Sequence, residues 1–240
     1  MSTTTRARGG PDLPYSVVAG VTPCAPGWLV ASAKLHGATF APEAPRVLSS
    51  FTEVLDERPT FSVIALNAPI GYVAETHAGG RTCDRMARAL LGRRGSTVHN
   101  APTRESLKED AVVAGDGLDA VTNVLLRRYR EVAAEMAPYR QRTVFEVHPE
   151  LSFFQINGDV PLRWSKKFEA GQDERCTLLR NRIPGVERVL EAELDDVPFT
   201  HLLDAAALLW TARRISARAG TRLPADPEWD DEGLRMEFVR

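Results

Sequence analysis

The sequence has little cysteine and no long apolar run, and each shortage excludes a class of protein. Its three cysteines, Cys24, Cys83 and Cys176, are far apart and lack the Cys-x-x-Cys spacing. Neither a disulfide framework nor a zinc site is therefore indicated, and we expect a reducing, cytoplasmic environment. No apolar run approaches the roughly 18 residues of a membrane span, and the N-terminus has no apolar signal core. We therefore expect no membrane partner.

The chain also has almost no net charge. Lysine and arginine number 30 against 32 aspartates and glutamates, which gives −2 at neutral pH. This balance excludes the global basic field that marks an obligate nucleic-acid binder. A nucleic acid and a small anionic substrate both remain open as partners. With 43% hydrophobic and 26% charged residues, the composition is that of a soluble globular protein.

No internal repeat and no linker divides the 240 residues. Residues 1–14 are polar and rich in glycine and proline, so we interpret them as a disordered tail before a single domain at 15–240. Apolar runs bounded by turn residues predict strands at 17–21, 28–33, 61–66 and 143–148, and a further strand near 38–40 or 46–48. Helices are predicted at 50–57, 82–91, 118–137, 150–156, 169–181, 186–193 and 199–219, and residues 233–239 as an edge strand or packed extension. This order implies an α/β fold with a mixed sheet and helices on both faces.

The stretch at 144–154 is predicted to be a strand that runs directly into a helix. Phe145 and Val147 point to one face of the strand, and Glu146 and His148 point to the other. Pro149 is suited to the first position of a helix. Ligands usually bind at the carboxyl ends of strands in open α/β sheets. The alternative is that Glu146 lies on a solvated sheet face.

Four positions are predicted to gather at one edge of the sheet. Thr22 ends the first strand, Asn67 ends the central strand, Glu146 lies near the end of the late strand, and Asp204 lies in the last helix. A carboxylate amid the leucines and alanines around Asp204 needs a partner or a metal. The alternative is that Asp204 lies on a polar stripe of its helix and pairs with an arginine.

Further candidates surround this group. His148 is either a general base or metal ligand beside Glu146, or a half-buried imidazole that is hydrogen-bonded to backbone. Glu150 either binds substrate or only complements the N-terminus of its helix. The cationic side chains of Arg85, Lys166 and Lys167 are candidates for binding an anionic substrate. The polar, irregular segment at 92–108 is long enough to be an active-site loop.

Several segments together resemble the DUF429 family, whose members are described as predicted RNase H-like nucleases. They are VAGVTPCAPGW at 18–28, APIG at 68–71, CDRMARALLGRRGS at 83–96, FEVHPELSF at 145–153, LLDAAALLWTARR at 202–214 and GLRME at 233–237. The resemblance implies an RNase H-like fold, with a five-stranded mixed sheet flanked by helices. It also implies an acidic cluster that binds Mg²⁺ or Mn²⁺, with Glu146 and Asp204 as the metal ligands. Two such ions can activate water and stabilise the leaving oxygen of a phosphodiester.

The sequence departs from the family pattern at two of the four positions. The first strand of the family ends in Gly-Val-Asp or Gly-Ile-Asp, where this chain has Thr22. The central strand is followed by Asp-x-Pro-Ile-Gly, where this chain has Asn67. Threonine and asparagine can offer neutral oxygens to a cation, but both are also ordinary turn residues. The acidic site is therefore depleted from four carboxylates to two.

Three functions follow from these observations. The first is a metal-dependent phosphodiesterase or nuclease with an altered site, in which Glu146, Asp204, His148 and Asn67 are catalytic. The second is an enzyme on the same scaffold that acts on a small anionic molecule. The third is a non-catalytic binding protein. A closed pocket too small for a nucleotide strand favours the second, and an exposed apolar patch without convergent polar groups favours the third.

Overall fold

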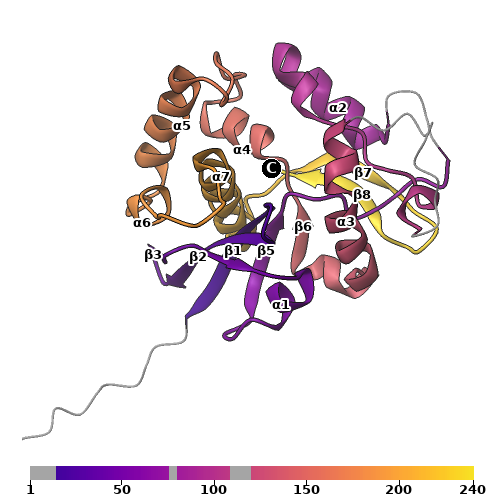
Figure 1. Cartoon of the computed structure of the whole chain (residues 1–240), viewed down its shortest axis with the longest axis horizontal. Coiled ribbons are helices and arrows are strands. Elements are labelled where there is room, and N and C mark those ends of the chain that lie inside the picture. Colours follow the sequence, from indigo (N-terminus) through magenta and orange to yellow (C-terminus); the bar gives the residue numbers. More distant parts are fainter. Residues whose placement is uncertain (1–14, 76–79, 109–119) are drawn as a thin grey trace, which may run out of the picture.

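A computed structural model describes residues 15–75, 80–108 and 120–240 (Figure 1). The predicted tail at 1–14, and the first two residues of the helix predicted at 118–137, lie outside the described residues. The strands are β1 Ser16–Pro23, β2 Trp28–His36, β3 Thr39–Pro42, β4 Arg46–Leu48, β5 Phe61–Leu66, β6 Val144–Glu146, β7 Arg222–Trp229 and β8 Arg235–Val239. The helices are α1 Phe51–Asp56, α2 Thr82–Leu91, α3 Ala120–Glu135, α4 Pro149–Ile156, α5 Glu169–Arg182, α6 Glu187–Leu190 and α7 Phe199–Ser216. Short 3-10 helices are η1 Gly92–Thr97, η2 Glu105–Leu107 and η3 Pro138–Arg142.

The central sheet is mixed and flanked by helices. Its strand order is β3-β2-β1-β5-β6, in which β1 pairs antiparallel with β2 and parallel with β5, and β5 pairs parallel with β6. Both candidates for a further strand are present. They are β3 and β4, which pair with successive parts of β2 as one interrupted edge, so β4 makes the sheet six-stranded without widening it. Because β1, β5 and β6 are parallel, their carboxyl ends meet at one edge.

Helices cover both faces of the sheet. The first apolar layer packs Val18, Ala31 and Ala65 against α4, α5, α6 and α7. The second layer packs Ala19 and Ile64, which alternate with the first set along their strands, against α1 and α3. Figure 1 shows α7 and α3 on opposite sides of the sheet. No described helix is both long and apolar enough to cross a membrane.

Helix α7 lies directly against β1. A Cβ added at Gly20 of β1 would lie 2.3 Å from the backbone nitrogen of Leu209 and 2.4 Å from the carbonyl oxygen of Ala205. Only glycine permits this approach, since a side chain there would overlap the backbone of α7. The close contact fixes where α7 presents its one acidic side chain, Asp204, relative to the end of β1.

Two features differ from the sequence prediction. The 92–108 segment contains η1 and η2 and is therefore not irregular throughout. The C-terminal residues form an antiparallel ribbon, β7–β8, of which only β8 was anticipated. A register shift between Leu223 and Glu228 allows β7 to contain two prolines, Pro224 and Pro227, which ordinarily argue against a strand.

Candidate functional site

A cavity of about 490 Å³ lies at the carboxyl ends of β1, β5 and β6. Eight of the nine predicted site residues line it: Thr22, Asn67, Glu146, His148, Glu150, Lys166, Lys167 and Asp204. The ninth, Arg85, does not line this cavity. It is exposed on α2, where its guanidinium donates to the Thr82 hydroxyl at 2.7 Å. Parallel strand ends therefore assemble the predicted side chains, and the exposed face of α2 is not part of the assembly.

Arg81 holds both carboxylate oxygens of Glu146. Its Nη1 lies 2.9 Å from Oε2 and its Nη2 lies 2.5 Å from Oε1. The same guanidinium donates to Asp84 Oδ1 at 2.8 Å and to the carbonyl oxygen of Gly71 at 2.9 Å. Each of the three charged side chains is at most 3% exposed. The interpretation that placed Glu146 on a solvated sheet face is therefore wrong, and we call Arg81, Asp84 and Glu146 the buried charge cluster.

Local structure explains how the buried charge cluster forms. Arg81 is the N-cap residue of α2, and Asp84 accepts a hydrogen bond from its backbone N–H at 3.1 Å. This acidic residue in the first turn also lies at the favourable end of the helix dipole. Glu146 accepts a further bond from the N–H of Ile70 at 2.9 Å, which ties β6 to the loop after β5. Every charged group in the cluster thus has several polar partners.

The pKa values in the cluster follow from burial and proximity. Burial acts to lower the pKa of Arg81, but the adjoining Asp84 and Glu146 carboxylates outweigh it and hold the pKa well above the usual value. Burial raises the pKa of Glu146, and Asp84 adds to this rise against the opposing effect of Arg81. The guanidinium is therefore permanently charged, and Glu146 is its partner rather than a free acid.

Glu150 belongs to a second group of ion pairs. It lies in the first turn of α4, which begins with Pro149 as predicted. Arg94 lies 3.1 Å from its Oε1, and Arg175, which is fully buried, donates to the same oxygen. Burial acts to raise the pKa of Glu150, but the two guanidinium groups outweigh it and lower the pKa. Glu150 therefore links η1, α4 and α5 besides complementing the helix N-terminus.

Both ring nitrogens of His148 are engaged with the backbone. Nδ1 accepts from the N–H of Glu150 at 3.2 Å, which makes His148 the N-cap of α4, and Nε2 lies 3.2 Å from the carbonyl oxygen of Thr97. This arrangement requires the proton on Nε2. Burial lowers the pKa of the imidazole, so His148 stays neutral near pH 7. Of the two interpretations of His148, the structure shows the half-buried, backbone-bonded one.

Asp204 pairs with Lys166, which reaches it from the loop before α5. Its side chain is 7% exposed and that of Lys166 is 35% exposed. The partner is thus a lysine rather than the arginine we considered. His201 lies one turn earlier on α7 and also lines the cavity. Burial lowers the pKa of His201, and its buried Nδ1 has no hydrogen-bond partner among the described residues.

Thr22 and Asn67 are bonded to each other. The Asn67 amide donates to the Thr22 hydroxyl at 2.9 Å, across the β1–β5 pair. Both lie on the α7 side of the sheet, since Val18 and Ala65, at even spacing from them, pack into the α7 layer. Glu146 lies on the other side, because its neighbours Phe145 and Val147 pack toward α7. The four predicted positions therefore reach one cavity from both faces of the sheet.

The arrangement does not fit the implied pair of divalent cations. A hard cation needs several free oxygen ligands. Both oxygens of Glu146 are bonded to Arg81, and Asp204 is bonded to Lys166. Across residues 15–75, 80–108 and 120–240, no three His, Cys, Asp or Glu side chains group as a metal site. Binding of Mg²⁺ or Mn²⁺ by Glu146 and Asp204 thus stays a prediction. The ion pairs of both carboxylates argue against it.

Sequence reasoning missed four residues of the site: Arg81, Asp84, Arg94 and His201. Asp84 and Arg94 lie within the segment at 83–96 that carries the family resemblance, and this was the available signal. Arg81 and His201 gave no signal of their own. An arginine before a helix and a histidine in the first turn of a helix are usually exposed. Their burial in this protein depends on tertiary contacts that the local sequence does not indicate.

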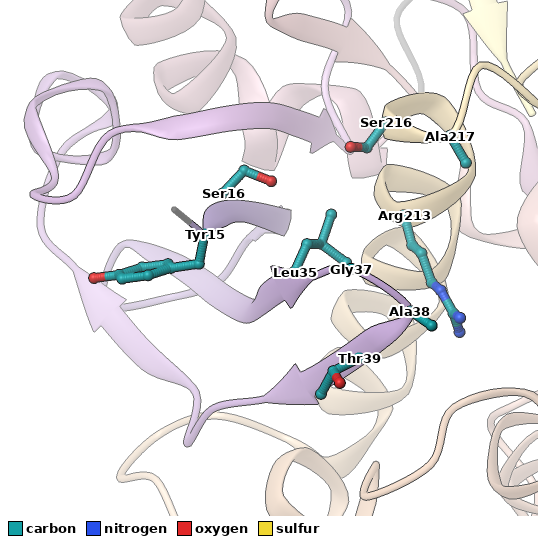
Figure 2. A pocket seen from close by; sticks show the side chains of 9 residues that line it. All are labelled: Tyr15, Ser16, Leu35, Gly37, Ala38, Thr39, Arg213, Ser216 and Ala217. Carbon is teal, nitrogen blue, oxygen red and sulfur yellow. The ribbon is translucent and has the colours of Figure 1, made fainter. Parts of the chain in front are cut away.

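A second hollow, of about 570 Å³, lies where β1 begins and α7 ends, and Figure 2 shows the side chains around it. Arg213 is its one charged lining residue. The Arg213 guanidinium lies over the ring of Phe40, 4.8 Å from the centroid. Tyr15 is 47% exposed and turns away from Arg213 in Figure 2. The polar groups around this hollow do not converge, so the site is the cavity at the carboxyl edge.

Comparison with known families matches the model named DUF429, described as "Protein of unknown function (DUF429)", over residues 20–229. The matched residues include all nine predicted site residues and end with β7. No curated protein and no solved structure matched the chain. The family resemblance in the sequence is therefore confirmed, and the cavity has to be interpreted from its own geometry.

Proposed function

Because the chain belongs to the DUF429 family, whose description specifies no activity, we propose a function from the cavity: the protein acts on a small anionic molecule, bound at the carboxyl edge of an RNase H-like sheet. The five-strand path of mixed direction, with helices on both faces, supports the RNase H-like assignment. The cavity is partly enclosed, and its volume of about 490 Å³ supports a small molecule rather than a strand of nucleic acid.

One observation carries the proposal. Among the residues that the structure describes, each carboxylate that lines the cavity is paired with a cationic side chain, and one lining cation has no ion pair. The lining cations are Arg81, Arg94, Lys166 and Lys167, and the lining carboxylates are Glu146, Glu150 and Asp204. Two further charged residues contact this group without lining the cavity. Asp84 bonds Arg81 and Arg175 bonds Glu150, so together they add one negative and one positive charge. The cavity therefore has an excess of one positive charge.

Lys167 supplies that excess. Its ammonium is exposed and has no hydrogen bond or ion pair with any residue that the structure describes. A mobile ammonium at the mouth of a partly enclosed site attracts and holds an anion. Arg94 and Lys166 already have carboxylate partners, so they orient a ligand rather than neutralise it.

His201 is the residue placed to move a proton. Its imidazole is neutral near pH 7, and its Nδ1 has no hydrogen-bond partner within the described ranges. Burial keeps the pKa of His201 below its usual value, and beside it Asp204 favours the imidazolium whereas Lys166 opposes it. His201 lines the cavity, so its imidazole is placed to take part in proton transfer with a bound ligand, whereas His148 uses both ring nitrogens to hold α4 and η1.

A metal-dependent nuclease is the second candidate, because Thr22, Asn67, Glu146 and Asp204 line one cavity. It requires Glu146 to leave Arg81 and Asp204 to leave Lys166. Removing a carboxylate from a buried guanidinium costs several kcal/mol. A single strand of nucleic acid also needs a cationic groove with several phosphate contacts, whereas the cavity has one cation in excess.

Calorimetric titration with inorganic phosphate, and separately with Mn²⁺, tests the proposal. Phosphate should bind the wild type, Lys167→Ala should weaken binding about three- to tenfold, and Arg127→Ala should leave binding unchanged. Arg127 is a matched control, because its side chain is 84% exposed on α3 and does not line the cavity. Failure of phosphate to bind, together with Mn²⁺ binding that Glu146→Gln abolishes, would overturn the proposal in favour of the nuclease.

A further inference from the structure

We infer that the natural ligand of this cavity joins its anionic group to an apolar body, so that the substrate class is an amphipathic carboxylate or phosphate ester. The inference rests on the proposed anion site and deepens it. It comes from a separate observation, which is that the two walls of the cavity differ in chemistry.

One wall is polar. It consists of Ser165, Lys166 and Lys167 in the loop before α5, with His201 and Asp204 on α7. These residues lie on the α7 side of the sheet, and Lys167 among them has no ion pair with any described residue. An anionic head group bound here contacts Lys167 and Lys166 and comes within reach of His201.

The opposite wall is an apolar stripe of α3. Val121, Leu125 and Tyr129 line the cavity, and their spacing of four residues places them on one face of the helix. Val121 is 46% exposed, Leu125 is partly buried and Tyr129 is 8% exposed, so the stripe runs from open surface into the interior. Ala68 and Ala101 extend it. An apolar body on this wall covers surface that residues 15–75, 80–108 and 120–240 leave exposed.

The cavity volume sets the scale of the ligand. About 490 Å³ lies within the range of roughly 300–1,000 Å³ that is typical of small-molecule sites. The space holds an acidic head group together with a chain or ring of several carbons. Inorganic phosphate alone leaves the stripe at Val121 and Leu125 uncovered, so the full site is larger than an ion requires.

Binding of a homologous series tests the inference. Two series of ligands are titrated into the wild type. The carboxylates are acetate, butanoate, hexanoate and octanoate, and the phosphate esters are methyl, butyl and hexyl phosphate. Each added CH₂ that packs against the apolar stripe should lower Kd about fourfold. The gain should stop once the chain extends beyond the lining residues of α3. The affinity gained per CH₂ should be the same in both series, so their affinities, interpolated to equal numbers of chain carbons, identify carboxylate or phosphate as the preferred anion.

Three variants separate the head group from the apolar body. Leu125→Asn should flatten the dependence of Kd on chain length, whereas Lys167→Ala should weaken all anions by a similar factor and keep that dependence. Val124→Asn is the matched control, because Val124 is 81% exposed on α3, does not line the cavity, and should change neither. Octanoate binding that is indifferent to Lys167→Ala would be non-specific and would overturn the inference.

The outcomes for the inference and for the proposed function are distinct. Acetate and octanoate binding with equal Kd would overturn the inference and leave the anion site standing. Failure of phosphate and of every member of both series to bind would overturn the proposed function, and the inference with it.

Discussion

Arg81 and Glu146, which are 65 positions apart in the sequence, form a bidentate ion pair in which each guanidinium nitrogen bonds a different carboxylate oxygen. The pair joins the start of α2 to the end of β6, and both side chains line the cavity. Two-point contact fixes the plane of the carboxylate as well as its position. Glu146 is consequently a structural partner in this arrangement.

Arg81→Met should destabilise the protein by about 3–5 kcal/mol, because Glu146 and Asp84 would remain buried without their guanidinium. Urea unfolding followed by circular dichroism measures the change. Arg85→Met, on the exposed face of the same helix, should cost no more than about 0.5 kcal/mol. A loss below about 1 kcal/mol for Arg81→Met would mean that the cluster does not hold α2 to β6.

The Lys166–Asp204 pair should show a smaller coupling, of about 1 kcal/mol, since Lys166 is 35% exposed and solvent screens it. A double-mutant cycle with Lys166→Met and Asp204→Asn measures this coupling free energy. Lys167→Met is the control, because that lysine has no ion pair among the described side chains and should change stability little. A coupling energy near zero would show that solvent already screens the pair completely.

Stability should fall as the pH drops below about 6.5, the pKa of an unfolded imidazole. Burial lowers the pKa of His148 and His201 in the folded protein, so the unfolded chain takes up protons on them first. The stabilisation is complete above the unfolded pKa, and falls below it by up to about 1.4 kcal/mol per pH unit for each histidine.

The variant His148→Gln/His201→Gln should therefore show a flatter dependence of stability on pH than the wild type between pH 6.5 and 5. The raised pKa of Glu146 acts in the opposite direction in both proteins, so the difference between the two curves reports the histidines. His36→Gln, at the exposed end of β2, serves as the control. Parallel curves for wild type and variant would contradict the assignment.

Restoring the acids of the family pattern should create a metal requirement. In Thr22→Asp/Asn67→Asp, two carboxylates replace a hydrogen-bonded pair whose side-chain atoms are 2.9 Å apart, so stability should fall by at least about 3 kcal/mol. Millimolar Mn²⁺ should recover much of that loss in a thermal unfolding experiment and should leave the wild type unchanged. The uncharged variant Thr22→Val/Asn67→Leu should not respond to Mn²⁺. An equal response of the wild type would support the nuclease instead.

Patterns along the chain were sufficient to predict the sheet and the assembly of the site. The apolar runs at β1, β2 and β5 are short and bounded by turn residues, a pattern that indicates buried strands. Pro149 marks the start of α4, because proline suits a first helical turn. Parallel strands end at one edge, so Thr22, Asn67 and Glu146 had to lie near one another. The β7 strand was missed because its two prolines suggest a loop, and the register shift that accommodates them depends on β8.

The partner of each acid could not be predicted from the sequence. Glu146 and Glu150 bind arginines that lie 65 and 56 positions before them, and a further arginine lies 25 positions after Glu150. Sequence periodicity reports which face of its own element a residue occupies, and it carries no information on which distant charge comes to lie opposite. The same limit applies to His148, whose second ring nitrogen bonds a carbonyl oxygen in η1.

The β7–β8 ribbon also has a consequence for the order in which the protein is made. Phe238 of β8 lines the cavity, and its ring lies 5.6 Å from the Arg81 guanidinium and 6.0 Å from the His148 ring. Met236 packs where Gly71 has no side chain. A ribosome synthesises β8 after every other element of this fold, so a nascent chain carries its buried charge cluster uncovered until the last strand emerges. The cavity is thus complete only after β8 has been synthesised and has paired with β7.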